Sequence, residues 1–361
     1  MNYNEIRRKT REVKIGNIAI GAGNQVAIQS MTNTDTHDKD ATLAQIKRLE
    51  KLGCEIIRIT VPDLSAAETI PFLKEKGVTI PIVADIHFDH RVALRCAELG
   101  VDKIRINPGN IGCEENVKAV CDICNQKNIP IRIGVNSGSL EKEILARHGA
   151  PTPEALCESA LYHVSLLEKF NFYNTVISIK ASNPYNMIRA NRLLAQKCDY
   201  PLHLGVTEAG SVDMGSIKSA VGIGSLLCDG IGDTIRVSLT DKPEEEIDAA
   251  KKIFRAVGME GRSGLDIVSC PTCGRTKIDL ISLVREFEER AKGEGIMDIP
   301  LKVAIMGCVV NGPGEAREAD IGIAGGKGEA VLIRKGEIVG KISEGDIVST
   351  LIEQIKNMSK Q

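Results

Sequence analysis

The sequence predicts an α/β protein, in which a (β/α)8 TIM barrel precedes a small α+β domain. Eight apolar, β-branched segments recur within about the first 240 residues, and amphipathic helical patterns separate them. Strands that alternate with helices indicate parallel pairing, and eight such units favour a closed barrel. The alternative is an open doubly wound sheet, which usually carries a glycine-rich turn after its first strand. In this chain GAGNQV precedes its strand and has Val26 in place of a third glycine.

The elements follow one another regularly along the barrel. Residues 13–32 begin as a short hairpin with glycine-rich turns and lead into the first strand. The eight predicted strands lie at 26–30, 56–60, 80–87, 103–107, 130–136, 175–181, 201–208 and 233–239. Helices are expected between them, at 41–53, 90–100 and 154–170, and another at 243–259 completes the ring. We assign the barrel to residues 1–262.

The remaining chain, residues 263–361, differs from the barrel in its sequence pattern and predicts the small second domain. A Gly/Ser segment at 261–264 forms the linker. Cysteines lie within 266–276 and 301–316, helices are expected over 282–293 and 346–357, and a hairpin over 331–342. Mixed short elements of this kind indicate an α+β unit.

Composition excludes several classes of protein. The 361 residues carry 46 basic and 48 acidic side chains, a net charge of −2, which argues against nucleic acid or a membrane surface as partner. The charged N-terminal segment has no apolar run, and no stretch of about 18 apolar residues occurs, so we expect neither a signal peptide nor a membrane span. We therefore expect a cytoplasmic protein. With 3% aromatic residues and no Trp, its core is expected to be aliphatic.

The segment Cys270-Pro-Thr-Cys273-Gly is the sharpest local signal, because a Cys-x-x-Cys-Gly turn brings two thiolates to one metal. A structural zinc site needs four Cys or His ligands. From residue 270 onward the sequence has only Cys270, Cys273 and Cys308, and no histidine. Three thiolates with an open fourth position fit a 4Fe–4S cluster instead. Glu315, seven residues after Cys308, is a candidate labile oxygen ligand.

Cys121 and Cys124 form a second Cys-x-x-Cys, but they lie in a helical pattern of the barrel. That spacing on a helix predicts two buried small side chains rather than a metal site. Six further cysteines occur singly, and we expect them in the core: Cys54, Cys96, Cys113, Cys157, Cys198 and Cys228.

Polar side chains gather at the predicted carboxyl ends of the strands, where barrel enzymes carry their chemistry. The candidates are Arg58, Asp85, His87, Arg105, Asn107, Arg132, Asn136, Lys180, Glu208, Arg236 and Ser238. Five of them are cations, and Asp85 and Glu208 can balance only two. Buried cations need anionic partners, and Arg forks match phosphate oxygens, so the surplus predicts a substrate such as a diphosphate.

The chain resembles the 4-hydroxy-3-methylbut-2-enyl diphosphate synthase family. The motifs that carry the resemblance are residues 270–275 (CPTCGR) and 306–315 (MGCVVNGPGE), together with 29–36 (QSMTNTDT) and 103–110 (KIRINPGN). The resemblance covers essentially the whole chain, without an inserted domain between the barrel and the cysteine domain.

The resemblance implies a reductive reaction. The ring of 2-C-methyl-D-erythritol 2,4-cyclodiphosphate opens, two electrons enter singly through the cluster, and one hydroxyl leaves as water. Glu208 would donate the proton, Glu315 would be the fourth cluster ligand, and Asn311 would lie near the cluster. It also implies a head-to-tail homodimer. Because no NAD or flavin motif is visible, electrons would come from a ferredoxin or flavodoxin.

Two other functions compete with this one. A pterin- or corrinoid-type methyltransferase barrel with a zinc knuckle would contain zinc and need no reductant. A redox sensor would use the cluster as a switch on nucleic acid, which the balanced charge argues against. The sensor would also leave the cations of the barrel mouth unexplained.

Overall fold

The computed structural model describes residues 3–259, 261–262 and 264–360. The chain forms two compact units, Asn2–Ile253 and Phe254–Gln361. Of the predicted domain limits, residues 1, 263 and 361 lie outside the described residues. No helix in the described part of the chain combines the length and the apolarity needed to cross a membrane.

Eight strands form the sheet of the first unit, and all of its pairings are parallel. Their order is β8 (Thr175–Lys180), β7 (Ile131–Asn136), β6 (Lys103–Ile106), β5 (Ile82–Asp85), β4 (Ile56–Thr60), β3 (Ala27–Met31), β10 (Thr234–Ile235) and β9 (His203–Leu204). A parallel bridge from Ile177 to Leu202 brings β8 beside the start of β9, so the two ends of the sheet meet. The predicted barrel is confirmed, although β9 and β10 are shorter than the predicted segments.

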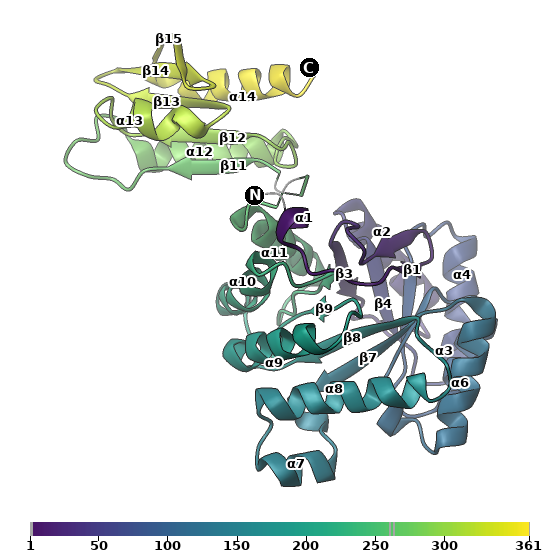
Figure 1. Ribbon diagram of the computed structural model, residues 1–361. Helices are drawn as coiled ribbons and strands as arrows, with labels where there is room; N and C mark the ends of the chain where they lie inside the picture. Colours follow the sequence, from purple (N-terminus) through teal and green to yellow (C-terminus); the bar gives the residue numbers. More distant parts are fainter. Residues whose placement is uncertain (1–2, 260, 263, 361) are drawn as a thin grey trace. The chain divides into compact units, whose positions relative to one another are not determined.

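Helices follow the strands and lie around their outside (Figure 1). They are α2 (Lys39–Lys51), α3 (Leu64–Ala67), α4 (Thr69–Glu75), α5 (His90–Glu98), α6 (Glu114–Lys127), α7 (Lys142–His148), α8 (Pro153–Glu168), α9 (Pro184–Lys197), α10 (Val212–Cys228) and α11 (Pro243–Ala256). Side-chain oxygens of Asp38, Asp89 and Asn183 accept backbone N–H groups at the first turns of α2, α5 and α9. Such caps explain where these helices begin.

The predicted short hairpin before the first strand is present, and it packs at the amino end of the barrel. It consists of β1 (Val13–Ile15) and β2 (Ile18–Ile20), which pair antiparallel and follow α1 (Tyr3–Ile6). Its buried residues Val13, Ile15 and Ile20 pack in one cluster with Ala27, Ile56, Val83 and Val176 near the starts of the strands. This apolar layer separates the barrel interior from solvent at that end.

Above this layer the barrel interior is polar, although the buried apolar residues of the described chain are mostly aliphatic, as expected. Gln29, Lys103, Arg132, His203 and Thr234 are all buried and come from five different strands. Inward-facing positions recur every second residue along a strand, so Lys103 and Thr234 lie on the same face as the mouth residues Arg105 and Arg236, two positions further on. The aliphatic core lies instead between strands and helices, for example at Ile57, Ile104 and Ile177.

The second unit is a five-stranded mixed sheet with helices. Its strands are β11 (Asp266–Ser269), β12 (Lys302–Met306), β13 (Ile321–Gly325), β14 (Glu329–Arg334) and β15 (Glu337–Ser343), in that order. The apolar sides of α12 (Leu280–Gly293) and α14 (Ile347–Met358) pack on one face, against Val303, Ile305 and Ile323. The other face carries Ala304, Met306 and Ala324. The predicted hairpin and both predicted helices are confirmed.

Candidate functional site

Strand register brings the predicted mouth residues of the barrel together. Asp85 pairs with Arg105 across β5 and β6, and Arg105 pairs with Arg132 across β6 and β7. Lys180, at the end of β8, pairs with Asn136 of β7. Because parallel strands end at the same edge, these side chains meet at the carboxyl end of the barrel.

Asp85 is the buried counter-charge on one side of the mouth. Its Oδ1 accepts from Nη1 of Arg105 at 3.2 Å, and its Oδ2 lies 3.5 Å from Nη2 of Arg58. Burial alone would raise the pKa of Asp85, but the two guanidinium groups outweigh it and hold the pKa below its usual value. Burial also lowers the pKa of Arg58 to about 10 despite Asp85. One buried carboxylate therefore pairs with two partly buried cations.

The second buried carboxylate among the cations is Glu246 on α11, not Glu208. Glu246 accepts hydrogen bonds from Nε and Nη2 of Arg236, at 3.2 and 2.9 Å. The Glu208 side chain is exposed, and no ion pair holds it within the described residues. Its backbone has φ +53°, a left-handed conformation uncommon for a residue other than glycine and typical of functional sites.

Like Arg132, Lys180 is a cation of the mouth that forms no ion pair with a carboxylate in the described part of the chain. Burial lowers its pKa well below the ordinary value, and the nearby charges of Arg236, Arg58, Arg132 and Arg105 lower it further. An ammonium group beside four guanidinium groups is stabilised only when an anion joins it. The mouth is therefore complementary to a ligand that carries several negative charges.

Two glycines leave space for the side chains of these cations. A Cβ at Gly134 of β7 would lie 2.6 Å from Nε of Arg105. A Cβ at Gly205 would lie 2.6 Å from the carbonyl oxygen of Arg236 and 3.3 Å from Nζ of Lys180. Any larger residue at either position would displace a charged group of the mouth. Sequence reasoning did not single out these glycines.

The remaining predicted mouth residues lie around the cations. His87 is exposed, with Nε2 3.9 Å from Oδ2 of Asp85. Asn107 is buried, and its side-chain oxygen accepts from the N–H of Gly109, which fixes the short helix η1 (Pro108–Asn110). Asn136 and Ser238 are half-buried at the ends of β7 and of the segment after β10.

The sequence did not identify four buried polar residues of the barrel as part of the site: Gln29, Lys103, His203 and Glu246. Gln29 and Lys103 lie two positions before Met31 and Arg105 on their strands, so strict alternation would have found them. Glu246 lies on a helix among three consecutive acidic residues, where nothing in the sequence marks it as buried.

In the second unit, two loops bring the three predicted cysteines to one edge of the sheet. Cys270 and Cys273 follow β11, while Cys308 follows β12, its parallel neighbour. The N–H of Lys277 donates to the carbonyl of Gly307 at 2.9 Å, and the N–H of Gly307 donates to Sγ of Cys270 at 3.3 Å. A Cβ at Gly307 would lie 2.8 Å from Cγ2 of Thr276, so only glycine allows this approach.

The surroundings of these thiols favour the thiolate form. N–H groups of Asn311 and Val310 lower the pKa of Cys308, and the N–H and side chain of Arg275 lower that of Cys273. Asn311 precedes helix α13 (Gly312–Glu315), which ends at the exposed Glu315. The charges of Cys273, Cys308 and Glu315 all raise the pKa of Arg275, so the three lie around it.

The donor set fits a metal cluster in its chemistry, because three thiols and a carboxylate lie on the segments that follow β11 and β12. As they stand, no three His, Cys, Asp or Glu side chains within the described residues are close enough to hold a metal ion.

The other cysteines behave largely as predicted. Cys121 and Cys124 are buried on α6, and so are Cys54, Cys96 and Cys157 in the barrel unit. The core assignment is wrong for Cys113 and Cys228, which are exposed, and Cys198 is half-buried. Cys113 directly precedes α6 and Cys228 ends α10, so both lie at helix ends.

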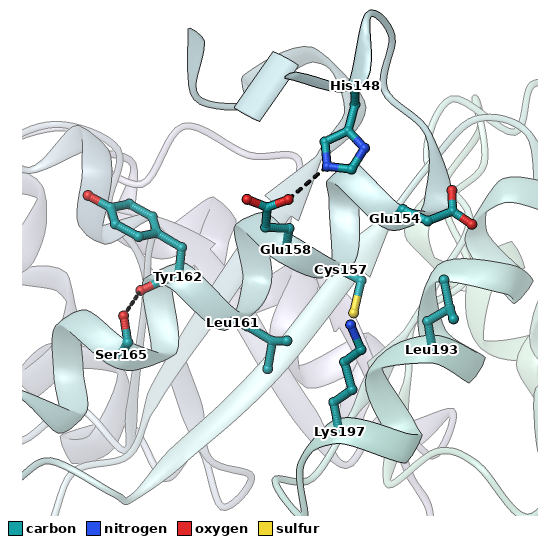
Figure 2. A pocket seen from close by; sticks show the side chains of 9 residues that line it. All are labelled: His148, Glu154, Cys157, Glu158, Leu161, Tyr162, Ser165, Leu193 and Lys197. Carbon is teal, nitrogen blue, oxygen red and sulfur yellow. Dashed lines mark hydrogen bonds and ion pairs between the residues drawn. The ribbon is translucent and has the colours of Figure 1, made fainter. Parts of the chain in front are cut away.

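A pocket of about 560 Å³ lies away from the mouth, on the outer helices. Figure 2 shows its lining from α7, α8 and α9, with His148 bound to Glu158 and Lys197 directed toward Cys157. It contains none of the predicted site residues. The cationic mouth remains the better candidate, because its unbalanced charge calls for a ligand.

The fold and the two sites define a two-domain TIM-barrel protein with a cationic mouth and a three-cysteine second domain. Residues 10–251 match the family described as the GcpE TIM-barrel domain, and residues 266–357 match the GcpE protein C-terminal domain. The chain belongs to the GcpE family.

Close relatives share the complete length of the chain. A protein of Clostridium perfringens is 57% identical over 98% of this chain and 99% of its own, and one of Caldanaerobacter subterraneus subsp. tengcongensis is 57% identical over 99% of both. One of Fusobacterium nucleatum is 55% identical over 98% of this chain and 97% of its own. Each is named 4-hydroxy-3-methylbut-2-en-1-yl diphosphate synthase (flavodoxin). The barrel is also similar to a DAHP synthase of Thermotoga maritima, with TM-score 0.49 and 11% identity over 71% of this chain and 77% of that one.

Proposed function

We propose that this chain is a 4-hydroxy-3-methylbut-2-enyl diphosphate synthase, an iron–sulfur oxidoreductase of the non-mevalonate isoprenoid pathway. Its substrate is 2-C-methyl-D-erythritol 2,4-cyclodiphosphate, which it opens and dehydrates with two electrons. The observation that carries the proposal is the mouth of the barrel, where Lys180 lies buried among four arginines. Family membership and the names of the relatives support the same substrate class.

The cations of the mouth bind the diphosphate. Arg58, Arg105, Arg132, Lys180 and Arg236 supply donors, since guanidinium forks match phosphate oxygens. His87, Asn107, Asn136, Ser238 and Asp85 line the same end of the barrel and orient the rest of the substrate. The bound diphosphate supplies the negative charge that Lys180 lacks in the free protein. The pairing of this buried cation therefore contributes to the affinity for the substrate.

Cys270, Cys273 and Cys308 hold a 4Fe–4S cluster, with Glu315 as its oxygen ligand and Asn311 beside it. Such a cluster supplies electrons one at a time and a Lewis-acidic iron. The thiolate-favouring N–H groups around Cys273 and Cys308 support this assignment. Glu208 donates the proton that lets the hydroxyl leave as water, since its exposed side chain is free to reach a bound substrate.

Electrons come from a flavodoxin, which the relatives carry in their names, with a ferredoxin as the other candidate. The enzyme works in the cytoplasm, where thiols stay reduced. It acts as a head-to-tail homodimer in which the cysteine domain of one chain completes the barrel site of the other.

The test begins with protein purified without oxygen and analysed for iron, sulfide and zinc. We expect about four irons and four sulfides per chain, with broad absorption near 400 nm. With reduced flavodoxin, the cyclodiphosphate should be converted to the allylic diphosphate, detected by phosphorus NMR or mass spectrometry.

Zinc at about one per chain, without iron after cluster reconstitution, would contradict the proposal. That result would instead favour a methyltransferase with a zinc knuckle, for which the named relatives give no support.

A further inference from the structure

Glu246 is a buried carboxylate that binds three residues from two segments of the barrel wall. Its side chain is 4% exposed and lies in the first turn of α11. Oε2 accepts from Oγ of Ser30 at 2.9 Å and from Nε of Arg236 at 3.2 Å. Oε1 accepts from Nη2 of Arg236 at 2.9 Å and from the N–H of Leu239 at 3.3 Å. All four donors thus meet on one carboxylate.

We propose that Glu246 is a positioning residue for substrate binding: it holds Arg236 and the segment that carries Ser238 in the geometry that receives the diphosphate. This inference rests on the proposed function and adds a residue that acts through another. Glu246 itself does not contact the substrate.

The geometry of the pair supports this role. Nε and Nη2 form one edge of the planar guanidinium group, and Glu246 occupies that edge with both of its oxygens. The Nη1 side of the group therefore points away from Glu246. A guanidinium held by two parallel hydrogen bonds has one orientation, whereas a free arginine side chain samples many.

The same carboxylate also fixes the neighbouring wall. Ser30 belongs to β3, which pairs with β10 just before Arg236. Leu239 follows Ser238, so its N–H bond to Glu246 sets the path of the chain through Ser238. One side chain thus orders two predicted substrate-binding residues, Arg236 and Ser238, and ties them to the adjacent strand.

A positioning role and a purely charge-neutralising role predict opposite changes in substrate affinity when Glu246 is removed. If Glu246 only cancelled the charge of Arg236, its removal would leave a more cationic mouth, and a diphosphate would bind more tightly. If Glu246 positions Arg236, its removal releases the guanidinium and the Ser238 segment, and binding becomes weaker.

The experiment measures binding of 2-C-methyl-D-erythritol 2,4-cyclodiphosphate to cluster-loaded enzyme by calorimetry, without reductant, so that no turnover occurs. We expect Glu246→Gln to weaken binding by about tenfold to a hundredfold, as for other residues that orient a binding group. In turnover, KM should rise more than kcat falls. Glu244→Gln is the matched control, because Glu244 lies in the same helical turn and forms an ion pair with Arg48.

The positioning effect should vanish when Arg236 is absent. In an Arg236→Gln background, adding Glu246→Gln should cause little further loss of affinity, a dependence that a purely structural role would not produce. Glu246→Asp retains the charge while shortening the reach, so it should fold and still bind several-fold more weakly.

Binding that is unchanged or tighter in both Glu246→Gln and Glu246→Asp would overturn the inference. Equal losses with and without Arg236 would overturn it as well. A wild-type enzyme that neither binds nor converts the cyclodiphosphate would instead contradict the proposed function itself.

Discussion

Nη1 of Arg132 donates a hydrogen bond to Oε1 of Gln29 across the interior of the barrel, over 3.1 Å. Arg132 lies on β7 and Gln29 on β3, which are separated by three strands on either side of the ring. The bond therefore spans the interior below the mouth and holds Arg132 beneath the expected substrate position. It also shows that the barrel interior is built for polar side chains.

The side chain of Lys103, in the same polar interior, should lower the free energy of unfolding. Its side chain is fully buried, and Nζ has no hydrogen-bond partner within the described residues. We expect Lys103→Met to stabilise the protein by about 1–3 kcal/mol, the usual cost of an unsatisfied buried polar group. Urea unfolding of the cluster-free protein measures it, and a destabilised variant would show that Lys103 has a favourable partner.

The stabilisation by Lys103→Met should depend on pH. Burial lowers the pKa of Lys103 well below 10.5 in the folded protein, so the unfolded chain binds the extra proton. Stability of the wild type therefore rises with pH up to the unfolded pKa, and the advantage of the variant should shrink between about pH 7 and about pH 10. A constant difference across this range would show that the protonation of Lys103 is not what destabilises the wild type.

Gly134→Ala should weaken substrate binding without unfolding the barrel. The new Cβ would lie 2.6 Å from Nε and 2.7 Å from Nη2 of Arg105, a flexible side chain that can move away. Loss of a charge-assisted hydrogen bond should raise KM about tenfold. Gly138→Ala is the control, since no atom lies within 4 Å of its added Cβ. Equal KM values in both variants would show that Arg105 does not bind substrate.

Cys308→Ser should remove the cluster, whereas Cys124→Ala should leave it intact. Cys308 lies on the loop that contacts Cys270 through Gly307, while Cys124 is buried on α6 in the other unit. Iron and sulfide analysis after reconstitution measures the difference. Cys124→Ala should cost only about 1 kcal/mol of stability. Full iron content in Cys308→Ser would remove Cys308 from the ligand set.

Glu208→Gln should lower kcat by about a hundredfold to ten-thousandfold, the range for loss of a general acid, with KM little changed. The left-handed backbone at Glu208 accommodates Gln as it does Glu, so the barrel should fold normally. Steady-state assays with excess reductant test this, alongside iron content as the control. A kcat near that of the wild type would assign proton donation to another residue.

Mixing two inactive variants tests whether the active site is shared between chains. Arg132→Met damages the barrel mouth and Cys308→Ser damages the cysteine domain. In a head-to-tail dimer, a mixed pair keeps one intact site, so random mixing should restore about a quarter of the wild-type activity. If barrel and cluster of the same chain work together, the mixture should stay inactive.

Much of the site could be predicted because it follows strand alternation. Arg105 lies on β6 and Asn107 directly follows that strand, two positions further on, so the rule that predicted the strand also placed both side chains on its inner side. The second buried carboxylate could not be predicted, because nothing in the sequence shows whether Glu208 or Glu246 is the buried acid. Only packing of α11 against the barrel wall buries Glu246, while the loop after β9 leaves Glu208 exposed.

The sequence by itself determined the order of eight strands, the cation-rich strand ends and the three cysteines of the second domain. These are local features, readable because β-strands repeat every two residues and cysteine ligands cluster in short motifs. Only the tertiary structure decided which acid forms an ion pair with which cation and where the barrel interior becomes polar. Those choices depend on side chains that meet across the barrel from distant segments, as Gln29 and Arg132 do, and on how far each group is removed from water.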